Sequence, residues 1–514
     1  MPDHRPLRSR LLSGLGLLTI PALLLTACSS PTEQEIEEAE ASPEDVEAFA
    51  PFYEQEPEWE TCEGTMLCAE IEVPLDYEDP EGETIEIQAI SSNTAPESGE
   101  HLLTNPGGPG SSGYDTVAED LEFIFSEELI DAYNVVGFDP RGVHRSAPVE
   151  CLTDEEMDEN RERVAEGEEE LDDEAAVEQA REDAQWLADR CEDRTGESLG
   201  HVDTVSAARD MDILRAALGE EELNYLGFSY GTKLGMTYAE HHPEHVGRFV
   251  LDGVLDVSVD SHELQLAQAR GFESALEDYA QWCVDQDECP VQGEPEDVIA
   301  AVQDLFAQVA EEPVEGHDGR TVPIGVLVSG FILPMYDPEG WGYLNEGLAY
   351  ALEEGDFYAF QHWADQSAGR EPDGSYDWKS QMAFRAIMCL DYPVSDDPEV
   401  IDEEYDETVE MAPTFGPYLG HSGIACAEWP HSPVTEPFEP TVEDMDEMLL
   451  IGTTGDPATP AEWAENTHEM VPASSLLVYE GEGHLAYRPD NDCVVELVDA
   501  YLLDGELFEG REEC

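Results

Sequence analysis

A serine that could act as a nucleophile lies in the run Gly227-Phe228-Ser229-Tyr230-Gly231. The run ends a strand-like stretch, Tyr225–Phe228, and precedes the helical pattern of Thr232–His241. A sharp turn from strand to helix lifts a serine hydroxyl clear of the backbone, and small flanking residues let other chain segments pass closely. The pattern therefore predicts Ser229 as the nucleophile of an acyl-transfer reaction. The alternative is a glycine-rich turn whose serine has no catalytic role.

Attack by a serine creates an oxyanion, which backbone N–H groups aimed at it can stabilise. The residue after the nucleophile, Tyr230, is the first expected donor. The second donor is expected in a loop after an earlier strand, and Asn105-Pro106-Gly107-Gly108-Pro109-Gly110 occupies that place. Glycines leave their N–H groups uncovered, so the sequence predicts Gly108 as this donor, with Gly107 as the alternative.

The serine also needs a base, and the base needs a carboxylate that orients it. His484 follows the strand-like Leu476–Tyr479, and Asp456 follows the strand-like Met448–Gly452. Either residue alone would be an ordinary turn or loop residue. Their order after Ser229, and their places after the last two strands, predict Asp456 as the orienting acid and His484 as the base. This chemistry needs no metal or organic cofactor.

Three other histidines, His241, His242 and His245, are close together and raise the alternative of a metal site. Pro243 breaks the helix between them, so they lack the i, i+4 spacing of histidine ligands on one helix face. We expect a helix end there. Arg141, in Asp139-Pro140-Arg141-Gly142, is expected to brace loops near the site.

Strands and helices alternate in the first part of the chain, which favours an α/β fold with a mainly parallel central sheet. Residues 261–440 interrupt this rhythm with long helical patterns, including Glu263–Asp285, Pro295–Ala310 and Trp341–Ala368. The strand pattern then resumes. We therefore expect a core formed by residues 58–260 and 441–514, interrupted by a mostly helical cap or lid at 261–440.

The first 28 residues have the features of an export signal. Arg5, Arg8 and Arg10 precede a short apolar run, and Leu25-Thr26-Ala27-Cys28 resembles the lipobox of bacterial lipoproteins. The sequence thus predicts lipidation at Cys28 and an exported protein, anchored by its lipid to the outer face of the cell membrane or released outside. An ordinary cleaved signal is the alternative. Residues 29–57 are expected to form an acidic tether.

The cysteine count agrees with export. Eleven cysteines less Cys28 leave ten, an even number, as an oxidising compartment favours. Sequence does not determine the connectivity, but pairing neighbours along the chain gives five expected disulfides. These are Cys62–Cys68, Cys151–Cys191, Cys283–Cys289, Cys389–Cys426 and Cys493–Cys514.

The chain is extremely acidic, with 121 Asp and Glu against 21 Lys and Arg and a formal net charge of −100. Such a polyanion repels phosphate backbones, which excludes nucleic acid as a partner. The repulsion opposes compaction at low ionic strength and is largely screened at about 1 M salt. We predict adaptation to a salty or alkaline exterior. A surface loaded with calcium is the alternative, but the DxDxDG-type loop that would support it is missing.

Several motifs in order make the chain resemble the secreted tripeptidyl aminopeptidases of actinobacteria, which are α/β-hydrolases related to prolyl iminopeptidases. The resemblance runs from about Trp59 to Cys514. Besides the segments already described, it rests on Val73-Pro74-Leu75-Asp76-Tyr77, Asp252-Gly253, and Ala386-Ile387 with Cys389 and Asp391.

This resemblance implies an exported serine peptidase that releases short peptides, expected to be tripeptides, from substrates with a free N-terminus. It also implies that the helical insertion is a lid. One departure, His144-Arg145 in the loop after Asp139-Pro140-Arg141, puts side chains close to the expected site. An esterase or lipase of the same fold is the alternative function, since the three catalytic residues do not separate esters from amides. A non-catalytic lipoprotein that binds peptides is a further alternative.

Overall fold

The centre of the protein is a ten-stranded sheet with the strand order β1-β2-β3-β5-β4-β6-β7-β10-β11-β12. In this order, every pair of neighbouring strands from β5 onward is parallel. The pairs β1–β2, β2–β3 and β3–β5, at one edge, are antiparallel. The strands are β1 Glu60–Thr61, β2 Leu67–Pro74, β3 Thr84–Ser91, β4 His101–Asn105, β5 Asn134–Phe138, β6 Leu223–Phe228, β7 Val246–Asp252, β10 Met448–Gly455, β11 Ser474–Glu482 and β12 Arg511–Glu513. The expected mainly parallel sheet is confirmed.

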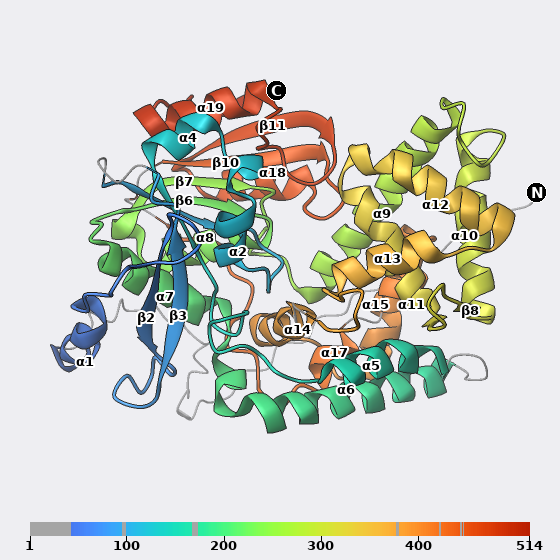
Figure 1. Cartoon of the computed structure of the whole chain (residues 1–514), viewed down its shortest axis with the longest axis horizontal. Coiled ribbons are helices and arrows are strands. Elements are labelled where there is room, and N and C mark those ends of the chain that lie inside the picture. Colours follow the sequence, from blue (N-terminus) through green and yellow to red (C-terminus); the bar gives the residue numbers. More distant parts are fainter. Residues whose placement is uncertain are drawn as a thin grey trace, which may run out of the picture. The chain divides into compact units, whose positions relative to one another are not determined.

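Helices cover both faces of this sheet (Figure 1). The helices flanking the sheet are α2 Gly113–Glu119, α3 Leu121–Ile124, α4 Glu127–Ala132, α7 Thr204–Leu218, α8 Tyr230–His241, α18 Ala461–Met470 and α19 Asp492–Asp504. Successive strand residues point to opposite faces, so Tyr225 packs with α7 and α8 while Leu226 packs with α2, α4 and α19. Double coverage explains why the central strands β5, β6 and β10 are mostly apolar in sequence.

The computed structural model describes residues 43–94, 99–166, 173–376, 380–420, 423–442, 445 and 447–514. The chain divides into two units, Met1–Glu47 and Ala48–Cys514, and the fold given above is that of the second. The expected signal segment and Cys28 lie outside the described residues. Within them, no helix has both the length and the apolar character needed to span a bilayer.

The expected tether is too long at its C-terminal end. Helix α1, Pro43–Tyr53, carries Phe52, which is buried in the core of the second unit. Tyr53 donates a hydrogen bond of 2.8 Å to the carboxylate of Asp212, and Gln55 donates one of 2.9 Å to the carbonyl of Glu72. Apolar side chains among the acids of this segment therefore attach residues 48–57 to the sheet domain.

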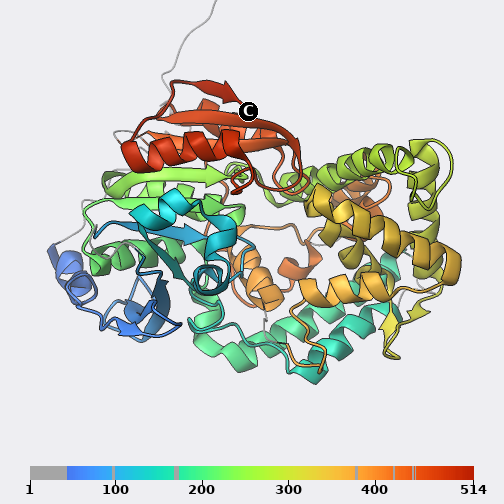
Figure 2. The same ribbon diagram turned by 45° about the horizontal axis from the view of Figure 1, so that its top comes forward.

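The insertion after β7 has an apolar cluster of its own, centred on Phe272, Leu305, Phe331 and Phe415. It forms a helical body beside the sheet in both views (Figures 1 and 2). Its elements are α9 Ser261–Val284, α10 Pro295–Glu311, β8 Val314–Glu315, β9 Thr321–Val322, α11 Ile324–Ile332, α12 Trp341–Glu354, α13 Tyr358–Ser367, α14 Ser380–Asp391, α15 Pro398–Met411, α16 Gly416–Leu419 and α17 Ile424–Ala427.

The long helical pattern over Trp341–Ala368 forms two helices. Gly355 ends α12 in the left-handed region, at φ +67°, and α13 begins at Tyr358. Glycine adopts this conformation at little cost, which makes it a common residue after a helix end. The apolar periodicity on both sides of the break concealed it in the sequence.

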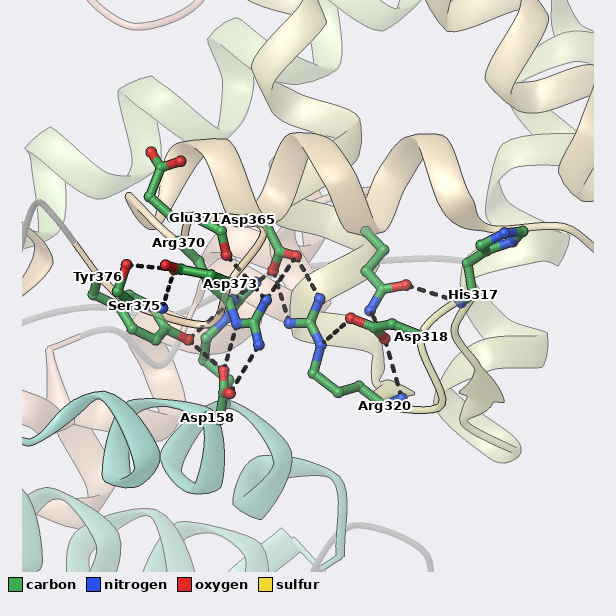
Figure 3. Close-up of polar contacts among 12 residues, drawn as sticks. Asp158, His317, Asp318, Arg320, Asp365, Arg370, Glu371, Asp373, Ser375 and Tyr376 are labelled. Atoms are coloured by element: carbon green, nitrogen blue, oxygen red, sulfur yellow. Dashed lines mark hydrogen bonds and ion pairs between the residues drawn. The ribbon is translucent and has the colours of Figure 1, made fainter.

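Two helices that precede the insertion also contact it. These are α5, Asp154–Glu166, and α6, Asp173–Thr195. Asp158 on α5 pairs with Arg370 at 2.7 Å, and Arg161 on the same helix pairs with Asp365 of α13 at 2.7 Å. Figure 3 shows the arginine side chains that pair with the carboxylates of Asp365 and Asp158 between these elements. The helical body thus includes α5 and α6, which precede residue 261, as well as the insertion.

We expect Asp365→Asn to destabilise the fold by about 3 kcal/mol, because it would leave partly buried arginines without their shared carboxylate. Asp365 accepts hydrogen bonds from Arg161 at 2.7 Å and from Arg320 at 3.0 Å. Thermal unfolding at fixed salt measures the loss. Asp373→Asn is the matched control, since Asp373 is exposed and its side chain accepts hydrogen bonds from Ser375. Equal unfolding temperatures for the two variants would contradict the role given to Asp365.

Five disulfides are present in the structure. They join Cys62 to Cys68, Cys151 to Cys191, Cys283 to Cys289, Cys389 to Cys426, and Cys493 to Cys514, which are the pairs expected from the sequence. The last one ties the C-terminal residue to the start of α19. Disulfides of this kind are typical of proteins that work outside the reducing cytosol.

Candidate active site

The residues expected to do chemistry all follow parallel strands at the same end of the sheet. Gly107 and Gly108 follow β4, Ser229 follows β6, Asp456 follows β10 and His484 follows β11. Strands β4, β6, β7, β10 and β11 are parallel neighbours, so their carboxyl ends lie along one edge. This edge is where open parallel sheets carry their binding sites.

Ser229 occupies a strained turn. Its backbone has φ +54° and ψ −124°, a conformation that residues with a side chain rarely adopt. The turn is fixed by its own hydrogen bonds: the Ser229 N–H donates to the carbonyl of Asp252 at 2.9 Å, and the Thr232 N–H donates to the carbonyl of Ser229 at 2.8 Å. Helix α8 begins directly after it. Strain of this type, held by the surrounding structure, is typical of a nucleophile on a strand-to-helix turn.

The loop after β4 passes directly against this turn. A Cβ atom placed on Gly107 would lie 2.5 Å from the carbonyl oxygen of Phe228 and 3.0 Å from the backbone nitrogen of Tyr230. Gly107 has φ +96° and Gly108 has φ +104°. The Gly107 N–H already donates to the side chain of Asn105 at 2.9 Å. Of the two glycines, Gly108 is therefore the better source of an N–H for a bound oxyanion.

Replacing Gly107 with alanine is expected to lower kcat/KM by about a hundredfold to a thousandfold, the usual cost of a spoiled oxyanion site. The added methyl group would overlap the Phe228 carbonyl and push the loop away from Ser229. Gly319→Ala is a matched control, because Gly319 also has a positive φ, +85°, but has no atom within 4 Å of the added carbon. Steady-state kinetics give kcat/KM for the two variants. A Gly107→Ala enzyme with the kcat/KM of the control would contradict this position for the loop.

His484 and Asp456 are in direct contact. The Nδ1 atom of His484 lies 2.8 Å and 2.9 Å from the two carboxylate oxygens of Asp456. Asp456 is itself held by the N–H groups of Ala458 and Thr459, at 2.9 Å and 2.8 Å, and by the Thr459 hydroxyl at 3.0 Å. These contacts fix the carboxylate so that it can orient the imidazole.

The pKa of His484 lies above its ordinary value of 6.5. Burial alone would lower this pKa, since it disfavours the charged ring. The charge and hydrogen bond of Asp456, together with the charge of Asp252, outweigh burial and raise it. These neighbours therefore stabilise the charged imidazolium form of His484 that a reaction would produce.

The insertion reaches both His484 and the nucleophile turn. The backbone N–H of His484 donates a hydrogen bond of 2.7 Å to the backbone carbonyl of Tyr336. The ring of Tyr336 meets the imidazole edge-on, with centroids 5.5 Å apart. At the turn, the hydroxyl of Tyr230 bonds to that of Thr204 at 2.5 Å, and Thr204 in turn bonds to Asp391 of α14. The helical body is thus attached next to the site.

Two further sequence expectations concern the neighbourhood of the site. Arg141 is buried, pairs with Asp210 at 2.7 Å, and donates to the carbonyls of Pro74 and Leu75. It braces loops, as expected. Arg145, in the loop that departs from the family pattern, forms an ion pair of 2.6 Å with Asp115. Its side chain is thus held by an acidic neighbour.

The cluster of three histidines marks a helix end. Helix α8 ends at His241, and a short 3-10 turn, Pro243–His245, follows it. The ring of His242 lies against that of Tyr238 at a tilt of 41°, and burial lowers the pKa of His242 to about 4. Across the described ranges, no group of three or more His, Cys, Asp or Glu side chains has an arrangement suited to a metal ion.

Sequence reasoning missed several residues that the structure brings to the site. Asp252 touches both the nucleophile turn and the His484 loop, Thr459 supports Asp456, and Tyr336 covers His484. Asp252 was visible as part of the Asp252-Gly253 motif, although the motif alone gives it no role. Tyr336 is far from the other residues in sequence and carries no local signal.

Comparisons with known proteins place the chain among hydrolases. A family profile described as alpha/beta hydrolase fold matches residues 100–294, and one described as TAP-like protein matches residues 412–514. Serine protease Hip1 of Mycobacterium tuberculosis is 32% identical over 465 residues, which cover 88% of each chain. Carboxylesterase B of the same organism is 33% identical over 526 residues, 99% of this chain and 98% of that one. The tripeptidyl aminopeptidase of Streptomyces lividans is 30% identical over 462 residues, 87% and 84%.

The chain therefore belongs to the α/β-hydrolase family, and the expected resemblance is confirmed. Within that family it is a serine hydrolase, with relatives named as a serine protease and a tripeptidyl aminopeptidase.

Proposed function

We propose that this serine hydrolase is an exported exopeptidase that releases short peptides, tripeptides above all, from the free N-termini of peptide substrates. The contact between Asp456 and His484, beside a strained Ser229 and a glycine loop, is the observation that carries the hydrolytic part. The names of the relatives support peptides as the substrate class. Five disulfides support an oxidising compartment.

In the proposed reaction, Ser229 attacks the scissile carbonyl while His484 takes its proton. The N–H groups of Tyr230 and Gly108 receive the charge that develops on the carbonyl oxygen. His484 then gives the proton to the departing amine, and an acyl-enzyme remains on Ser229. Water hydrolyses this intermediate with His484 again as base, which restores the free serine.

The helical body, from 261 to 440 with α5 and α6, is proposed as a lid over this centre. Its contacts through Tyr336 and Asp391 support that role, since they attach it beside His484 and Tyr230. A lid that limits the length of the bound segment would account for the release of short peptides. We also propose a lipid on Cys28 as the sole membrane attachment.

The activity should depend on pH through His484. The base must be neutral to accept a proton, so kcat/KM is lost as pH falls through the pKa of His484. Because that pKa is raised, the acid side of the profile should lie above pH 6.5. A profile measured at constant ionic strength tests this. An acid limb centred near the ordinary pKa of a carboxyl group, about 4, would contradict His484 as the base.

The second candidate function is an esterase of the same fold, favoured by the relative named carboxylesterase B. A panel of acyl esters and N-terminally free peptide amides separates the two functions. Higher kcat/KM on the peptide amides supports the peptidase. Turnover of esters alone, still dependent on Ser229, would replace it with the esterase.

A further inference from the structure

Asp252 is a buried carboxylate that the proposed reaction does not use. It ends β7, is 0% exposed, and lies in the middle of the sheet between the β6 and β10 ends. Its partners are backbone N–H groups: Tyr487 donates to it at 2.8 Å and Ala486 at 3.0 Å. In the described part of the chain it forms no ion pair with lysine or arginine. Burying a carboxylate in this way costs free energy, so its presence needs a reason beyond packing.

Its contacts join the two halves of the site. The backbone carbonyl of Asp252 accepts the N–H of Ser229 at 2.9 Å. Its side chain holds the N–H groups of the two residues that lie second and third after His484. One residue therefore sets the position of the nucleophile turn with its main chain and the position of the histidine loop with its carboxylate.

Asp252 also acts on the imidazole by its charge. Its carboxylate raises the pKa of His484, alongside the larger effect of Asp456. Burial raises the pKa of Asp252 itself to about 6, while the Tyr487 and Ala486 N–H groups and the charge of His484 lower it and Asp456 raises it. His484 and Asp456 are thus the titratable groups that face it.

We propose that Asp252 is a positioning residue for the catalytic centre, whose ionised carboxylate fixes the His484 loop against the Ser229 turn and adds a second negative charge beside the imidazole. It acts through His484 and touches no substrate. The inference rests on the proposed roles of Ser229 and His484 but does not depend on peptides being the substrate.

The test is Asp252→Asn, which keeps the size of the side chain and removes its charge. We expect kcat to fall about tenfold to a hundredfold with KM little changed, as for a small displacement of a catalytic group. The acid limb of kcat/KM should also move to lower pH, because the pKa of His484 loses a contribution that raised it. A fall in kcat with an unmoved limb, or no change in either, would overturn the proposal.

Asp499→Asn is the matched control. Asp499 is another buried carboxylate of the same region and accepts a hydrogen bond from the Tyr487 hydroxyl at 3.2 Å, but among the described residues it accepts none from a backbone N–H of the His484 loop. This variant should leave the acid limb in place. A shift of the same size in both variants would also overturn the proposal, since it would reflect general buried charge.

Two further measurements keep the outcome clear. Labelling of Ser229 by a fluorophosphonate requires His484 but no peptide recognition, so its rate in Asp252→Asn reports on positioning even if no peptide is cleaved. In the unaltered enzyme, the slope of log kcat/KM against pH should rise above one where Asp252 takes up a proton as well as His484. It should return to one at lower pH, because the enzyme with protonated Asp252 keeps the reduced rate expected of Asp252→Asn. A slope that never exceeds one would contradict the role of Asp252 without any variant having to fold.

Discussion

Replacing Ser229 with alanine is expected to lower kcat by about 10⁵- to 10⁶-fold and to abolish labelling by a fluorophosphonate. The estimate follows from serine hydrolases in which the nucleophile or the base is removed, where the remaining catalysis comes from the oxyanion site and binding alone. Ser229 is the residue whose backbone is strained at φ +54° and whose turn the glycine loop approaches. Active-site titration followed by steady-state kinetics measures the loss.

The variant should fold as the unaltered protein does, since only one hydroxyl is removed from a partly exposed position. Ser367→Ala, at the exposed end of α13, is the control and should retain full activity. His484→Ala should cost about as much as Ser229→Ala, and the two losses should not add, because the residues act as a unit. Residual turnover within tenfold of the unaltered enzyme would exclude Ser229 as the nucleophile.

The second large effect is expected for Asp456→Asn, with a fall in kcat of about 10⁴-fold. An asparagine keeps an oxygen for the N–H groups of Ala458 and Thr459, so the loop should hold its shape. Its amide group cannot accept the Nδ1 proton of His484 as the carboxylate does, so the imidazole is no longer held in the tautomer that the reaction needs. The negative charge that raises the pKa of His484 is also lost. Kinetics over a pH range measure both changes.

Asp490→Asn provides the matched control for that variant. Asp490 is exposed, lies on the same loop as His484, and pairs only loosely with Arg488 at 3.8 Å. It should change kcat by less than a factor of two. If Asp456→Asn were equally mild, another carboxylate would have to orient His484, and Asp252, whose charge also raises the pKa of His484, is the candidate.

Much of the sheet could be predicted because its strands have strong local patterns. Strands such as Asn134–Phe138 are continuous apolar runs between turn residues, which is what burial on both faces requires. Ser229, Asp456 and His484 were likewise predictable, since each follows such a run and their order along the chain is informative. The structure brings Asp456 and His484 into contact, although they are separated by a helix in sequence.

Other features depend on contacts between distant residues, and local patterns do not encode those. The burial of Phe52 depends on a surface formed by residues far along the chain, so the acidic composition of the segment alone predicts a tether. The break at Gly355 was hidden between two helical patterns. The place of Asp252 beside both Ser229 and His484 depends on the order of β6, β7, β10 and β11 in the sheet. Only the folded arrangement gives that residue a role.

The most direct test of the proposed exopeptidase is the release of a fluorophore from free and N-acetylated tripeptide amides, at about 0.1 M and about 2 M salt. Ser229→Ala is the control. We predict cleavage of the free tripeptides alone, lost in the variant, and faster at high salt because the net charge of −100 is then screened. Equal cleavage of the acetylated peptides, or cleavage that survives in Ser229→Ala, would contradict the account.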